Sequence, residues 1–171
     1  SQNGVTFGRY VNSQGEEHFP AQISRTLGAT NSGPKIGPIV INEVQYHPAP
    51  TFDEFIELHS VVSTNVPLYD PNFATNTWKL SGLNFTFPQN ISIPPGGFLI
   101  LSPIDPTLFR SRYGVPASTQ ILGPYTGGLQ DSGERLELTR PDPPNTNGTV
   151  PQIVVDAVRY NDKEPWPVVA D

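Results

Sequence analysis

Short segments of alternating apolar and polar residues recur along most of the chain, and turns that contain Pro and Gly separate them. Segments of this kind, rich in β-branched and aromatic residues, are typical of β-strands with one buried and one solvated face. The predicted strands lie at 39–46, 54–61, 77–81, 84–87, 97–102, 134–139 and 153–160. About seven strands at this spacing predict an all-β, immunoglobulin-like antiparallel β-sandwich.

One short helix is predicted among the strands, at residues 105–114. Asp105 is a suitable N-cap, Pro106 favours the first helical position, and Gly114 is a residue type that ends helices. A helix of about two turns beside the strands leaves the fold in the all-β class.

The first and last predicted strands share one pattern of apolar positions. By strict alternation, three positions of each strand fall on the same face. They are Val40, Val44 and Tyr46 in the first strand, and Val154, Val158 and Tyr160 in the last. We therefore expect equivalent strands near the start and the end of the sandwich.

The domain boundary is expected near residue 34. Residues 1–34 hold one short strand at most, and the stretch 26–34 is rich in Gly, Thr and Asn, as connectors are. Residues 35–171 carry the predicted strands and form the sandwich domain. We expect 1–34 to be a linker, together with a piece that closes a preceding module.

The amino-acid composition excludes several kinds of chemistry. The 171 residues include no Cys, so disulfides, thiol catalysis and Cys-ligated zinc are excluded. A formal net charge of −6 without a basic cluster argues against nucleic acid as a partner. No apolar run approaches the ~20 residues of a membrane span, so we expect no membrane insertion. Met is absent even at the first position, and we therefore expect a segment of a longer protein.

Carboxylates on and near the first two strands are the best candidates for a ligand site. Glu43, Glu57 and Asp70 have the hard oxygen donors that calcium prefers. No calcium-binding loop is present, so such a site has to assemble across strands. The alternative is structural: these groups bond to loop backbone or decorate a strand. Glu57 shares a face with Phe55 and His59, which predicts partial exposure.

Signals for catalysis are weak. The three histidines, His18, His47 and His59, have no evident third ligand or nucleophile beside them, and no Gly-x-Ser-x-Gly turn or phosphate-binding loop occurs. We therefore predict no catalytic residues and no cofactor, with calcium as the one open ion. Trp166, between two prolines, is either a plug for one end of the core or an exposed anchor for a partner.

The motifs, taken in order, resemble those of the lamin tail domain family. They are INEVQYHP at 41–48, DEFIEL at 53–58, LYDP at 68–71, WKLSG at 78–82, GPYTG at 123–127, GERLEL at 133–138 and PWP at 165–167. LYDP, GPYTG and PWP are similar to the bacterial form. Residues 1–34 resemble the tail that closes such domains.

The resemblance implies a non-catalytic structural or interaction module of a larger exported bacterial protein. It implies a place outside the cell or on the bacterial surface, with a protein or cell-surface component and the neighbouring domains as partners. The alternative is a calcium-dependent or carbohydrate-binding accessory domain. A calcium module is expected to melt at a higher temperature with calcium than with chelator.

Overall fold

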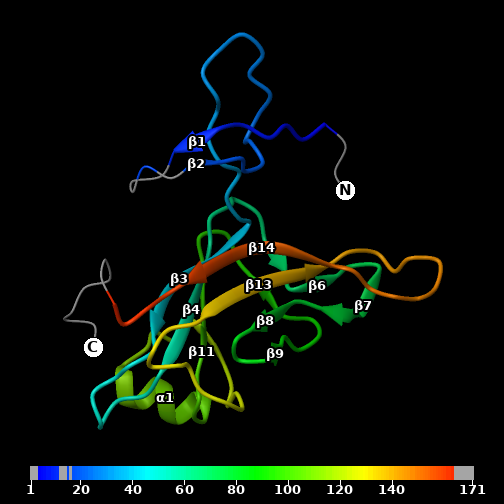
Figure 1. The fold of residues 1–171 in the computed structure, drawn as a ribbon. Helices are drawn as coiled ribbons and strands as arrows, with labels where there is room; N and C mark the ends of the chain where they lie inside the picture. The colour runs from blue at the N-terminus through cyan, green and yellow to red at the C-terminus, as the bar shows by residue number, and fades with distance from the viewer. Residues whose placement is uncertain (1–3, 12–14, 16, 164–171) are drawn as a thin grey trace. The chain divides into compact units, whose positions relative to one another are not determined.

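The computed structural model describes residues 4–11, 15 and 17–163. It divides the chain into two compact units, Ser1–Ile36 and Gly37–Asp171. Figure 1 shows the strands and the helix of these units. In the described residues no helix has the length and hydrophobicity that a membrane span requires.

The N-terminal unit is built around a polar side chain. Strands β1 (Tyr10–Val11) and β2 (Glu17–His18) pair antiparallel. Gln22 is buried, donates to the carbonyls of Gly8 and Pro20, and accepts from the N–H of Gly33. A Cβ at Gly8 would lie 2.6 Å from the Gln22 side chain, so a larger residue there would displace Gln22 from its hydrogen bonds. The segment that contains Phe7 thus pairs within its own unit, where it bridges to Ala21.

The C-terminal unit consists of two four-stranded sheets that face each other. The first has the order β12-β11-β4-β3 and the second the order β14-β13-β8-β9. The strands of the first sheet are β3 (Ile39–Gln45), β4 (Phe55–Ser60), β11 (Phe98–Leu101) and β12 (Gln120–Leu122). The strands of the second are β8 (Lys79–Ser81), β9 (Phe85–Thr86), β13 (Arg135–Pro141) and β14 (Gln152–Arg159).

Two small antiparallel pairs complete the strands. They are β5 (Val66–Pro67) with β10 (Ser92–Ile93), and β6 (Tyr69–Asp70) with β7 (Phe73–Thr77). The core lies between the two large sheets and draws apolar side chains from both. Its fully buried members include Ile56, Leu58, Leu99, Leu80 and Leu138. The predicted all-β, sandwich-like fold is confirmed.

The helix α1 (Pro106–Tyr113) also confirms its prediction. The Asp105 carboxylate accepts from the N–H groups of Thr107 and Leu108, and Gly114 ends the helix in the left-handed region. Phe109 of α1 packs with Ile100 of β11 and Ile121 of β12 in a second apolar cluster. The helix therefore covers part of the first sheet on the side away from the main core.

One strand pair departs from the antiparallel pattern. Strands β11 and β12 are parallel, with Ile100 opposite Ile121. Parallel neighbours need a crossover of about a dozen residues or more. The segment that contains α1 supplies that crossover.

The prediction that Val40 shares a face with Val44 and Tyr46 is wrong, because a β-bulge interrupts β3. Ile41 pairs with Leu58, but the next pair is Glu43 with Glu57, so Asn42 is the extra residue. The bulge shifts the alternation by one position. Ile41 and Val44 consequently pack on the main core.

The prediction that Val154 shares a face with Val158 and Tyr160 is wrong for the same reason, a bulge in β14. The register shifts where Leu138 pairs with Asp156 and Thr139 pairs with Val154. Val155 and Val158 then pack on the core, while Val154 is half exposed. Each of the two matching strands thus carries a bulge, and strict alternation fails in both.

Candidate functional site

Glu43 and Glu57 face each other across the β3–β4 pair. The Asn42 amide donates to Glu57 Oε1 at 2.8 Å. Glu57 is half-buried and Glu43 is exposed. Neither carboxylate forms an ion pair with any residue that the structure describes. Like charges directly opposite each other destabilise a sheet, so this pair favours a cation.

Asp70 does not join this pair. It lies in β6, is buried, and accepts the N–H of Asn72 at 2.8 Å in a local turn. Within 4–11, 15 and 17–163, no three His, Asp or Glu side chains are close enough together to hold a metal ion. The structure thus brings together two of the three calcium candidates, and calcium binding stays a prediction.

A pocket of about 180 Å³ opens beside Glu43, between the edge strands β3 and β14. Its lining residues are Ile41, Asn42, Glu43, Val44, Tyr46, Val158 and Tyr160. The rings of Tyr46 and Tyr160 stack with their centroids 4.5 Å apart. Glu43 is the one charged residue among the described residues of this lining. The pocket therefore combines an apolar wall with a carboxylate.

Two contacts hold the walls of this pocket. The Asp156 carboxylate of β14 accepts the N–H of Ile41 at 2.8 Å, which links the edges of the two sheets. The Tyr160 hydroxyl donates to Glu134 Oε1 at 2.8 Å. Burial, and next the Glu134 carboxylate, raise the pKa of Tyr160 well above its ordinary value. Tyr160 thus stays neutral and acts as a wall, not as an acid or base near neutral pH.

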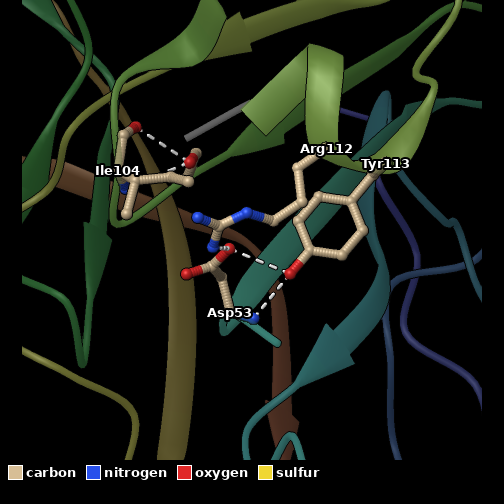
Figure 2. Close-up of polar contacts among 5 residues, drawn as sticks. Asp53, Ile104, Arg112 and Tyr113 are labelled. Carbon is tan, nitrogen blue, oxygen red and sulfur yellow. Dashed lines mark hydrogen bonds and ion pairs between the residues drawn. The ribbon is translucent and has the colours of Figure 1, made fainter. Parts of the chain in front are cut away.

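A second polar cluster joins the loop before β4 to α1 (Figure 2). Arg112 Nη1 lies 2.6 Å from Asp53 Oδ2, and the Tyr113 hydroxyl donates to the same oxygen at 2.9 Å. The Asp53 N–H donates to the Tyr113 hydroxyl at 2.6 Å. The hydrogen bond to Asp53 raises the pKa of Arg112, and burial raises that of Tyr113. Arg112 and Tyr113 of the helix both bond to Asp53, so the cluster fastens the loop to the helix.

Glu54 has a structural role as well. Its carboxylate accepts the N–H of Leu129 at 3.0 Å and lies 3.4 Å from the Tyr125 hydroxyl. Burial, followed by the charge of Glu54, raises the pKa of Tyr125. The carboxylate holds the loop after β12 against the start of β4.

No histidine is among the described residues that line the pocket. The His59 ring stacks on Phe98 with centroids 4.3 Å apart, and its Nδ1 lies 3.3 Å from the Gly97 carbonyl. His47 is exposed beyond the end of β3, and His18 belongs to β2 of the N-terminal unit. Trp166 lies outside the described residues, so its prediction as plug or anchor stays open. Trp78 is buried in the core.

Sequence reasoning found Glu43 but missed the pocket beside it. The pocket needs Val158 of β14 and Tyr160, which follows that strand, next to Val44 of β3 and Tyr46, which follows β3. The sequence does contain one relevant signal, the pattern of apolar positions that the first and last strands share. That pattern identifies the apolar residues of the pocket, but it does not show that they meet across the two sheets.

Comparison with known proteins adds no relative: neither a family model nor a curated protein matches the chain.

Proposed function

We propose that this chain is a non-catalytic interaction module of a larger protein. The observation that carries the proposal is the apolar surface of the N-terminal unit. Among the described residues, seven large hydrophobic side chains of Ser1–Ile36 are exposed, against six in the much longer Gly37–Asp171. The seven are Phe7, Tyr10, Val11, Phe19, Ile23, Leu27 and Ile36. Concentrated apolar exposure marks surfaces that bind other proteins.

The small size of this unit supports the same conclusion. No described residue of Ser1–Ile36 is a buried large hydrophobic residue, and its buried centre is the polar Gln22. Units below about 40 residues usually need disulfides, metals or association to be stable, and the chain has no Cys. Burial of side chains such as Leu27 against a partner supplies the missing apolar contacts.

The resemblance to lamin tail domains supports an immunoglobulin-like topology and a scaffolding role. It also supports a bacterial protein exported to the surface or the medium, whose neighbouring domains are among the partners. The two facing sheets agree with such a topology at the level of fold class. A net charge of −6 counts against nucleic acid as the partner, because binding to nucleic acid needs basic groups that neutralise its phosphates.

Capture experiments with the source cells test the proposal. The tagged chain is compared with a Phe19→Ser/Leu27→Ser double variant, in which two exposed residues become polar. Thr30→Ser, an exposed and polar position in the same unit, is the matched control. We expect a defined set of proteins with the native chain and the control, and its loss with the double variant. Equal capture by all three chains would contradict the proposal.

The calcium-dependent alternative has one observation in its favour, the facing carboxylates of Glu43 and Glu57. Binding to the folded state raises stability by mass action. A melting curve with millimolar calcium is compared with one in chelator, and both are repeated with Glu43→Gln. An upward shift that Glu43→Gln removes would favour this alternative, and an unchanged midpoint would exclude it.

A further inference from the structure

The pocket between β3 and β14 has the size and chemistry of a subsite for one side chain. Its volume is about 180 Å³. Sites for drug-sized molecules are larger, about 300–1,000 Å³, whereas a cavity of about 150 Å³ holds one benzene ring. The pocket therefore accepts a single side chain and not a cofactor.

The lining selects which side chain fits. Val44, Val158 and the stacked rings of Tyr46 and Tyr160 offer an apolar surface to an aliphatic stem. Lys and Arg side chains bury their methylene groups on such surfaces while the charged end reaches a polar rim. Among the described residues of this lining the charged one is Glu43, which is exposed.

The pairing of Glu43 with Glu57 also favours a cation beside the pocket. Glu43 lies opposite Glu57, and neither carboxylate has a cationic partner among the described residues. The formal charge of the whole chain is −6. An incoming ammonium or guanidinium group relieves the repulsion between the two carboxylates.

The position on two edge strands indicates how the side chain arrives. β3 ends the first sheet and β14 ends the second. Extended segments that bind beside a sheet place alternate side chains into pockets. We propose that this pocket binds a Lys or Arg side chain of an extended segment of a partner protein. This inference rests on the proposed function as an interaction module and names one of its contact sites.

Peptide titration followed by amide NMR of the full chain tests the inference. The probes are heptapeptides of Gly, Ser and Thr, blocked at both ends, with one central lysine, arginine, norleucine or glutamate. We expect saturable shifts at Ile41–Val44 and Val158–Tyr160, with dissociation constants on the order of millimolar for one anchoring side chain. Lysine and arginine peptides should bind about two- to fivefold more tightly than the norleucine peptide.

Variants at Glu43 provide the control for charge. Glu43→Gln should bring the lysine peptide to the level of the norleucine peptide, and Glu43→Lys should make the glutamate peptide the better ligand. Asp131→Asn, at an exposed carboxylate outside the pocket lining, should change nothing. High salt should remove the preference for lysine, because it screens exposed charges.

Four results would overturn the inference. They are no binding at millimolar peptide, shifts at other residues, equal affinity for lysine and norleucine, and calcium that shifts the same amides and displaces the lysine peptide. None of them affects capture through Phe19 and Leu27, so failure of this inference is distinct from failure of the proposed function.

Discussion

The Asp156 carboxylate accepts a hydrogen bond from the backbone N–H of Ile41 at 2.8 Å, and this contact joins the edge of one sheet to the edge of the other. Both residues lie at bulges, where the regular ladder is interrupted. β3 is the edge strand of its sheet, so an amide on its open side has no strand partner and needs another acceptor, and a carboxylate is a strong one. The contact thus stabilises the β3 bulge and one side of the pocket together.

Replacement of Asp156 tests the importance of this link. Asp156→Ala should lower the free energy of unfolding by about 1.5–3 kcal/mol, the range for a hydrogen bond to a charged group. Asp156→Asn keeps an acceptor oxygen and should cost less. Urea denaturation measures both, with Asp131→Ala as an exposed control. If Asp156→Ala and the control have the same midpoint, the carboxylate does not stabilise the bulge.

Alkaline pH should destabilise the sandwich through Tyr125 and Tyr160. Burial raises the pKa of both hydroxyls above the ordinary value of 10.0, so the folded state holds these protons more tightly than the unfolded state. Because the pKa is higher in the folded state, the stability is fully present below about pH 10 and is lost as pH rises further.

Urea midpoints at pH 8, 9, 10 and 11 measure this dependence. We expect equal midpoints at the first two values and a fall above pH 10, and Tyr125→Phe should make the fall shallower. A midpoint that stays constant to pH 11 would show that these hydroxyls ionise alike in both states.

The cap of α1 should be measurable in the same assay. Asp105 accepts from two N–H groups at the start of the helix. Its replacement by alanine should cost about 1 kcal/mol, whereas Asp105→Ser should preserve most of the stability. Equal losses for Ala and Ser would mean that capping is not the cause.

The elements that could be predicted from the sequence are those whose identifying residues lie close together in the chain. Asp105, Pro106 and Gly114 determine both ends of α1, and each acts within one turn of the chain. Long strands such as β13 and β14 were found because several alternating positions identify them. Strands of two residues, such as β5 and β10, carry too few positions for a period to be recognised.

The candidate site was predictable only in part, because it depends on contacts between distant segments. Glu43 and Glu57 stand out as carboxylates in neighbouring strands, and the structure pairs them. The bulges in β3 and β14 change which residues face the core, and the link between Asp156 and Ile41 spans most of the domain sequence. No local pattern around Val40 or Val154 reveals that shift.

The central claim is that the apolar side chains of the N-terminal unit contact a partner protein. Photo-crosslinking in the source cells tests it most directly, with benzoylphenylalanine placed at Phe19 or Leu27, and at Thr30 as the exposed polar control. We expect discrete higher-mass adducts from Phe19 and Leu27 and none from Thr30. The absence of adducts from Phe19 and Leu27, or an equal yield from Thr30, would contradict the account.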